Sequence, residues 1–336
     1  MDSVTHIALG ACMGEAFAGR TVGKKAMLWG ILAQSIPDID FIASFWMKTT
    51  DDLLTHRGFT HSILFALLVS VPIAAAANRL HRPHDISFKR WLAFISSAVL
   101  VHIFLDAFNN YGTGWFEPFS HARISFNSIY VADPFFSFGP GIALILLWIL
   151  RKKNTARKWI WRSGLTLSFL YLGYCVINKF SVTSETKKIL AANNIHYKRL
   201  LTTPAPLQSW LWFVVAETDS GYYTGYRSVF DRKPLLDLHY TPQHNELCAQ
   251  VSNQDDLNKL IRFSQHYYTL EQHVDTIILN DLRFGQITGW KDPTQGFVFY
   301  YYLQPSASND LVVQRGRFAK WNSESFHAFI QRIKGN

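Results

Sequence analysis

Long apolar runs alternate with short basic segments in the first half of the chain, and this pattern predicts membrane helices. A straight helix needs roughly 20 apolar residues to cross the hydrocarbon core, and a shorter run needs tilt or flanking aromatic residues. One candidate span, residues 4–18, is weaker because it is rich in Gly and Ala, which suit close helix packing better than contact with lipid. We predict spans at residues 26–47, 63–78, 91–108, 135–150 and 159–178, with 4–18 as the weaker sixth.

The pattern changes after residue 180, where alternating aromatic and polar residues predict antiparallel strands. A short amphipathic stretch, Glu185–Leu200, precedes strand candidates at Trp210–Ala216, Tyr222–Phe230 and Gly296–Leu303. The predicted fold is therefore mainly α. We expect a polytopic transmembrane helical bundle over residues 1–180, followed by a small α+β domain with an antiparallel sheet over residues 181–336.

Composition supports a membrane protein. Hydrophobic residues make up 49% and charged residues 17%, against about 25% charged residues in an average soluble domain. The net charge of +9 does not indicate nucleic acid, because the basic residues flank apolar runs rather than forming one amphipathic face. The three cysteines have no close spacing, which excludes a disulfide framework or a zinc finger. Residues 1–20 lack a basic leading region, so we expect no cleaved signal peptide.

The distribution of Lys and Arg among the short loops predicts the orientation in the membrane. The 20–25, 79–90 and 151–158 loops are strongly basic, whereas the 48–62 and 109–134 loops carry balanced charge. Because basic loops stay in the cytoplasm, we expect the other two loops to lie on the extracytoplasmic side. The last span then leaves the C-terminal domain on that side too.

Two segments place ionisable residues inside predicted spans. Asp38 and Asp40 follow Pro37, which breaks a helix, and carboxylates at membrane depth are costly without a partner charge, a polar cavity or a metal. A helix-ending turn at the membrane interface is the competing interpretation. His102 and Asp106 are four residues apart, so they share one helix face. For this pair the competing interpretation is a hydrogen bond within the core.

A third segment, His56-Arg57-Gly58-Phe59-Thr60-His61-Ser62, places two imidazoles in an outer loop, and His6 lies at the outer end of the first segment. A lone histidine pair is more often a surface or core feature. Here the predicted orientation brings seven ionisable residues to one depth, so we expect them to converge. The seven residues are His6, Asp38, Asp40, His56, His61, His102 and Asp106.

Imidazole and carboxylate without thiolate form a ligand set suited to Zn, Mn or Fe(II), with Zn favoured. The set is large enough for two ions, or for one ion with supporting carboxylates. Arg57 could bind a phosphate or carboxylate, or could serve as a snorkelling or capping residue. We predict His6, Asp38, His56, His61, His102 and Asp106 as metal ligands, and Asp40, Arg57 and Asp106 as catalytic residues.

Several other polar residues are weaker candidates. His121 and Asp133 lie in the second outer loop, and Tyr111 and Thr113 lie in the turn after the His102 helix. The histidines outside these groups lack neighbours of the same kind, so we expect them on the solvated surface. They include His81, His84, His239 and His244.

The motifs Thr5-His6, Pro37–Asp40, His56–Ser62 and His102-x-x-x-Asp106 together resemble the YdjM-like family of membrane-bound, metal-dependent hydrolases. The resemblance covers residues 1–180, and the string His-Arg-Gly-x-Thr-His-Ser is its most specific part. Leu282–Gly285 resembles the extension of longer members. The resemblance implies a hydrolase of the cytoplasmic (inner) membrane. The His/Asp set is also similar in kind to zinc-dependent phospholipase C.

These observations predict a hydrolase in which a metal-activated water attacks an ester or phosphoester at the outer membrane–water interface. The membrane lipid bilayer is the expected partner, with a lipid as the candidate substrate. Two alternatives stay open. A non-catalytic scaffold or binding protein would use the His/Asp cluster structurally. A transporter would use the carboxylates as an ion relay, although the polar groups lie near one face and no inverted repeat is visible.

Overall fold

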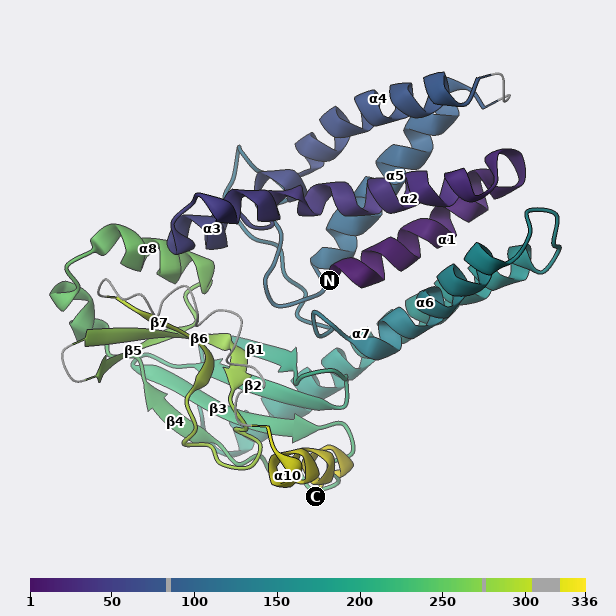
Figure 1. Cartoon of the computed structure of the whole chain (residues 1–336). Helices are drawn as coiled ribbons and strands as arrows, with labels where there is room; N and C mark the ends of the chain where they lie inside the picture. Colours follow the sequence, from purple (N-terminus) through teal and green to yellow (C-terminus); the bar gives the residue numbers. More distant parts are fainter. Residues whose placement is uncertain (83–85, 274–275, 304–320) are drawn as a thin grey trace. The chain divides into compact units, whose positions relative to one another are not determined.

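The computed structural model describes residues 1–82, 86–273, 276–303 and 321–336 (Figure 1). The chain forms two compact units. The helical unit comprises Met1–Trp46 and Thr55–Cys175, and the sheet unit comprises Met47–Leu54 and Val176–Asn336. Helix α7 (Arg157–Ala192) begins in the helical unit and continues into the sheet unit. The sequence placed the domain boundary at residue 180, within this helix.

The helical unit is built from three pairs of helices that follow one another along the chain, with the connections within the pairs at one end (Figure 1). Among the described residues, α4 (Ile63–Leu80), α5 (Phe88–Asp106) and α7 are long and apolar enough to cross a membrane, and α6 (Pro134–Ile149) is a shorter apolar helix. The predicted fold class is confirmed. The pairs are α1 (Ser3–Val22) with α2 (Lys24–Ser35), α4 (Ile63–Leu80) with α5 (Phe88–Asp106), and α6 (Pro134–Ile149) with α7.

The range 26–47, predicted as a membrane span with a helix break at Pro37, forms two elements. Helix α2 ends at Ser35, and the chain continues as a 3-10 helix, η1 (Ile36–Phe45). Pro37 is the physical cause, because it has no backbone N–H to continue the helical ladder. Two short elements follow, α3 (Thr49–Thr55) and η2 (Phe59–His61). The helix break predicted at Pro37 is therefore present, and residues 26–47 do not form a single helix.

Helices α1 and α2 pack through glycine. A Cβ atom at Gly30 would overlap the backbone carbonyl of Gly10, and one at Gly14 would overlap the carbonyl of Ala26. Small residues at such spacing let two helix backbones approach closely. The Gly- and Ala-rich first segment therefore packs closely against its neighbour in the chain. This contact holds the start of α1, where His6 lies, against the end of α2.

We expect Gly30→Leu to destabilise the protein by about 1–3 kcal/mol, because the added side chain must displace backbone rather than a flexible side chain. Gly141→Leu is the matched control, since a Cβ atom at Gly141 on α6 meets no atom within 4 Å. The free energy of unfolding in detergent, measured by denaturant titration, distinguishes the two variants. Equal unfolding curves for both variants would contradict the close packing of α1 and α2.

The described residues of the sheet unit form two antiparallel sheets where the sequence predicted one. The first has the strand order β1-β2-β3-β4 and the second β5-β6-β7. The three predicted strands correspond to β2, β3 and β7, which are confirmed. The strands are β1 (Arg199–Pro204), β2 (Leu211–Glu217), β3 (Gly221–Ser228), β4 (His239–Pro242), β5 (Tyr268–His273), β6 (Thr276–Gln286) and β7 (Phe297–Tyr302).

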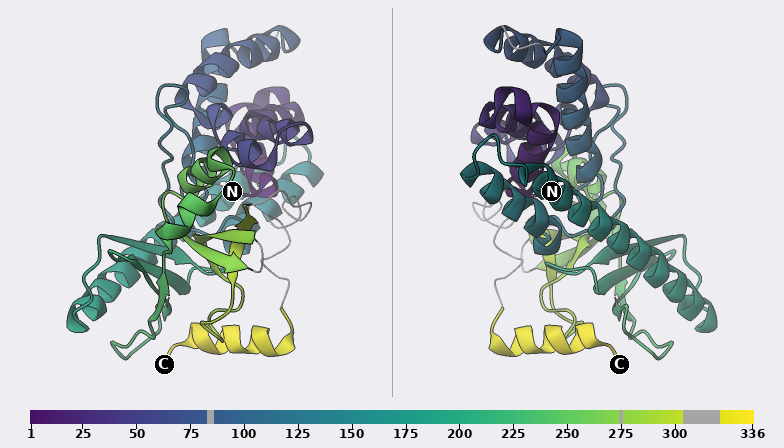
Figure 2. Two further views of the ribbon diagram at one scale, coloured as in Figure 1. Left: turned by 90° about the vertical axis from the view of Figure 1, so that its left-hand side faces the viewer. Right: turned by 90° about the vertical axis from the view of Figure 1, so that its right-hand side faces the viewer.

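The described helical segments beside the sheets are η3 (Asn245–Gln250), α8 (Gln254–Phe263) and α10 (Ser323–Lys334). Figure 2 shows α10 in yellow at the end of the coloured chain. Its Phe329 joins a buried core with Phe213 of β2 and Tyr222 of β3. The hydroxyl of Ser228 donates to the carbonyl of Ile333 over 2.5 Å, so the last helix is fixed to the end of β3.

Candidate metal centre

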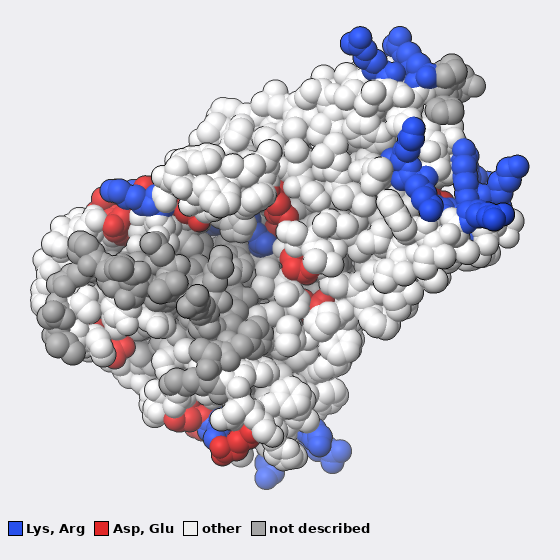
Figure 3. Space-filling model, in the orientation of Figure 1, with Lys and Arg blue, Asp and Glu red and all other residues white. Residues whose placement is uncertain are grey.

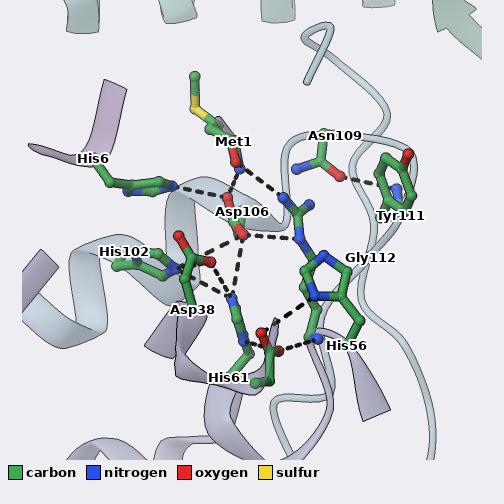
Figure 4. Close-up of polar contacts among 12 residues, drawn as sticks. Met1, His6, Asp38, His56, His61, His102, Asp106, Asn109, Tyr111 and Gly112 are labelled. Atoms are coloured by element: carbon green, nitrogen blue, oxygen red, sulfur yellow. Dashed lines mark hydrogen bonds and ion pairs between the residues drawn. The ribbon is translucent and has the colours of Figure 1, made fainter. Parts of the chain in front are cut away.

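Four of the predicted residues meet in the helical unit: Asp38, His61, His102 and Asp106 (Figure 4). Each offers one ligand atom, and these atoms all lie within 4.8 Å of one another. They come from three elements. Asp38 lies on η1, His61 is the last residue of η2, and His102 and Asp106 share one face of α5. The His61, His102 and Asp106 side chains are fully buried, whereas that of Asp38 is 18% exposed. The cluster could therefore bind a metal ion reached past Asp38.

The spacing of the ligand atoms matches a single tetrahedral ion. Ligands at about 2.0–2.1 Å from a zinc ion at tetrahedral angles lie about 3.3 Å from one another. The two Nε2 atoms of His61 and His102 are 3.2 Å apart. Asp38 Oδ1 lies 3.6 and 3.5 Å from these two nitrogens, and Asp106 Oδ2 lies 3.4 and 3.9 Å from them. Four of these five separations lie within about 0.3 Å of the tetrahedral value, and the separation of 3.9 Å lies about 0.6 Å above it.

The tautomer of His102 is fixed by a backbone carbonyl. Its Nδ1 lies 2.6 Å from the carbonyl oxygen of Gln34, and a carbonyl can only accept, so Nδ1 carries the proton. This carbonyl is near the end of α2, where Pro37 has no N–H to donate back to it. A neutral His102 ring therefore points the lone pair of Nε2 into the cluster.

The tautomer of His61 is fixed in the same sense. The Thr60 hydroxyl donates to Asp40 Oδ2 over 3.1 Å, so it accepts from His61 Nδ1, which lies 3.1 Å away. Asp40 Oδ2 is also 3.5 Å from this nitrogen. Burial lowers the pKa of His61 to about 3, so the ring is neutral at physiological pH. Two nitrogen lone pairs thus face each other beside two carboxylates, an arrangement that could hold a cation.

The Asp106 carboxylate is held by groups that lie outside the four-residue cluster. Its Oδ1 contacts the amino group of Met1 and lies 3.1 Å from His6 Nε2. Its Oδ2 lies 3.2 Å from Arg57 Nε but accepts no hydrogen bond from the described residues. The Arg57 guanidinium also donates to the carbonyl of Met1 over 3.0 Å and lies over the ring of Tyr111. Asp106 Oδ2 is therefore available as a metal ligand within the cluster.

The other predicted site residues lie around the four. His6, predicted as a ligand, lies outside the cluster between Gln34 and Asp106. His56, also predicted as a ligand, is 40% exposed and contacts Asp40 Oδ1 at 3.3 Å (Figure 4). Asp40 is buried behind His61 and accepts a hydrogen bond of 2.7 Å from the backbone N–H of Arg57. His6 and Asp40 thus contact residues of the cluster, and His56 contacts Asp40.

Sequence reasoning missed Gln34 and Thr60. Gln34 is fully buried, its side-chain amide donates to the carbonyl of Ala98 over 2.6 Å, and its Oε1 lies 3.0 Å from His6 Nδ1. An amide inside an apolar helix, three residues before Pro37, was the available signal. Thr60 carried a weaker signal, because Ser and Thr hydroxyls occur in many turns, where they bond to nearby backbone.

The weaker candidates have separate roles. Asp133 caps α6 and accepts a hydrogen bond of 2.8 Å from Tyr171, while His121 is exposed and pairs with Glu117 at 2.9 Å. Thr113 is buried, and its N–H and C=O pair with those of Ile124.

One of the four histidines assigned to the surface is buried. His81 accepts a hydrogen bond of 2.7 Å from the indole N–H of Trp29 and stacks on Trp91, so its surface assignment was wrong. Its neighbours in space come from other helices, so its own segment gave no signal. His239 and His244 are exposed as predicted, and His84 lies outside the described residues.

The fold and the cluster define a polytopic membrane protein with a His/Asp site that could hold a metal ion. The chain belongs to the YdjM inner membrane protein family, whose model matches residues 1–182. It is similar to YfhP of Bacillus subtilis, with 26% identity over 300 residues, covering 84% of this chain and 87% of the relative. It is also similar to the inner membrane protein YbcI of Escherichia coli, with 30% identity over 122 residues, covering 36% and 69% respectively. No solved structure matches. The family and the apolar helices support an inner-membrane location.

Proposed function

We propose that the protein is a membrane-bound, metal-dependent hydrolase whose ion is held by Asp38, His61, His102 and Asp106. The single observation that supports this proposal is the pair of Nε2 atoms 3.2 Å apart, both with lone pairs directed at two carboxylates. Two imidazoles and two carboxylates without thiolate favour zinc, with manganese and iron as alternatives. A bound divalent ion supplies Lewis-acid polarisation of an ester or phosphoester and lowers the pKa of a coordinated water.

In this proposal the surrounding residues position the ligands. The Gln34 carbonyl orients His102, Asp40 and Thr60 orient His61, and Arg57 fixes Asp106. Such partners hold the tautomer and the direction of a ligand, and their loss typically weakens metal binding 10- to 100-fold. Asp40 and Arg57, which the sequence suggested as catalytic, are therefore assigned as positioning residues.

We also propose that the site faces the extracytoplasmic side at headgroup depth. Supporting this, α4 begins two residues after His61 and runs to the basic connection at Arg79, and α5 returns to Asp106. Figure 3 shows Lys and Arg side chains gathered at the end of the helical unit where these connections lie. Basic connections favour the cytoplasm. Phe41, Phe45 and Trp46, on or next to η1, are strongly exposed, as interfacial aromatic residues are.

This placement supports an ester or phosphoester of a membrane lipid as the substrate, because a site at headgroup depth meets such bonds at high local concentration. Since α7 is the last candidate span among the described residues, the proposal also places the C-terminal strands and helices on the extracytoplasmic side. The proposal assigns no nucleic-acid partner.

The experiment uses the full chain in nanodiscs of native membrane lipid, supplied with Zn or Mn. We expect release of a headgroup or acyl product, detected by mass spectrometry, and at least about a tenfold loss of the rate in His61→Ala. His121→Ala, at an exposed histidine, is the matched control and should keep the wild-type rate. Absence of product from the metal-loaded wild type with either ion would overturn the hydrolase proposal.

A further inference from the structure

The end of the helical unit that carries the basic connections contains a cavity of about 930 Å³. Its walls come from the second half of α1, the α6–α7 connection and the first turns of α7. The cavity is far from the candidate metal centre, because Arg20 and His6 are separated along α1 by about 20 Å at 1.5 Å per residue. The charged residues of the lining are Glu15, Arg20, Lys152, Lys153, Arg157, Lys158 and Arg162.

The acidic residue of this lining is already neutralised. Arg157 Nε and Nη2 donate to the two carboxylate oxygens of Glu15 over 2.8 and 2.5 Å, and both side chains are buried. The remaining donor, Nη1, bonds to the carbonyls of Leu147 and Leu150. This bidentate pair forms one wall of the cavity and carries no net charge. The positive charge of the cavity therefore comes from the other basic residues of its lining.

Five cationic side chains remain, and none of them makes an ion pair with a described acidic residue: Arg20, Lys152, Lys153, Lys158 and Arg162. Two of them are held in place by neighbours. Lys152 Nζ donates to the carbonyl of Thr21 over 2.6 Å, and the Arg162 guanidinium lies 5.3 Å from the ring centre of Trp161. Cations gathered around one concave space repel one another, so an anion that enters it is favoured.

The position of the cavity identifies the kind of anion. Trp161 and Phe17 also line it, and Trp159 beside it is strongly exposed, as aromatic residues are where a span meets the headgroup layer. Lys and Arg at this depth attract anionic lipid, and guanidinium and ammonium groups both bind phosphate. A cavity of about 930 Å³ is also much larger than a phosphate ion requires.

We propose that this cavity binds the phosphate of an anionic phospholipid headgroup, as a site separate from the metal centre. The phosphate lies among Lys152, Lys153 and Arg162, and the acyl chains leave along the apolar surface of α7. The site does not depend on the proposed hydrolase activity. Its expected effect is to fix the α6–α7 connection against α1 at the membrane surface.

The test compares two triple variants that remove the same charge from the same end of the helical unit. Lys152→Gln, Lys153→Gln and Arg162→Gln alter exposed residues of the cavity and leave the buried Glu15–Arg157 pair intact. Arg79→Gln, Arg82→Gln and Lys89→Gln alter exposed residues of the α4–α5 connection, outside the cavity lining. The full-length proteins are delipidated in detergent and titrated with phosphatidylglycerol or phosphatidylcholine, and bound lipid is counted by native mass spectrometry.

We expect the wild type and the α4–α5 variant to bind one phosphatidylglycerol tightly and the cavity variant to bind it on the order of 100-fold more weakly. Phosphatidylcholine should bind weakly to all three. Equal losses in the two variants would overturn the proposal, because the attraction would then be a general effect of surface charge. Displacement of the lipid by inorganic phosphate at a similar concentration would overturn the proposal that the bound phosphate group belongs to a lipid. Lys152→Arg with Lys153→Arg keeps the charge and should keep the binding, which separates a folding defect from a lost site.

Discussion

His61→Ala and His102→Ala will each leave the purified protein with less than about a tenth of the metal bound by the wild type. Each variant removes one of the two Nε2 atoms that face each other at 3.2 Å. The three ligands that remain cannot close a four-ligand site, and the space left by the imidazole admits water. Metal content is measured by plasma mass spectrometry on protein without a histidine tag, and the wild type should approach one ion per chain.

His56→Ala is the control that separates this geometry from the sequence prediction. The sequence included His56 among the ligands, whereas its side chain lies 40% exposed beside Asp40. We therefore expect His56→Ala to retain the metal. Equal metal loss in His56→Ala and His61→Ala would contradict the four-residue centre. A well-folded wild type that takes up no metal would instead indicate that the His/Asp cluster is structural.

The two aspartates near Pro37 show how far the sequence could lead. Pro37 in an apolar run predicted both a broken helix and a polar function, and the break is present. The sequence assigned Asp38 as a metal ligand and Asp40 as a catalytic residue, whereas in the structure Asp38 faces the two imidazoles and Asp40 supports His61 from behind. Their difference follows from the 3-10 helix, in which residues two apart point about 240° from each other. Assigning these roles requires the local helix type, which neither residue specifies.

The histidines show a second limit. His102 and Asp106 were predictable as a pair, because a spacing of four within a long helix fixes their shared face. Arg57 lies between His56 and His61 in the sequence. Its φ of 59° places its backbone in the left-handed region, which residues other than glycine rarely adopt. This turn directs His56 away from the cluster. Backbone geometry of this kind is set by tertiary contacts, here by the hydrogen bond from the Arg57 N–H to Asp40.

The buried pair at the basic end of the helical unit gives the second large effect. We expect Glu15→Ala to lower the free energy of unfolding by about 3–5 kcal/mol, because the Arg157 guanidinium is then buried without its counter-charge. Gly19 supports this geometry, since a Cβ atom there would overlap the Glu15 carboxylate. Denaturant titration in detergent measures the loss. Lys198→Ala, which removes an exposed ion pair with Asp219, should leave the transition unchanged.

A double replacement separates charge from packing at the same position. Glu15→Met with Arg157→Met removes both charges, so the penalty for an unpaired buried ion disappears, and apolar replacements of buried pairs are often neutral. The recovery should be incomplete, because Arg157 also donates to the carbonyls of Leu147 and Leu150 at the end of α6. We therefore expect the double variant to be more stable than Glu15→Ala and less stable than the wild type. If the double variant were no more stable than the single one, the loss would come from packing around Glu15 rather than from the ion pair.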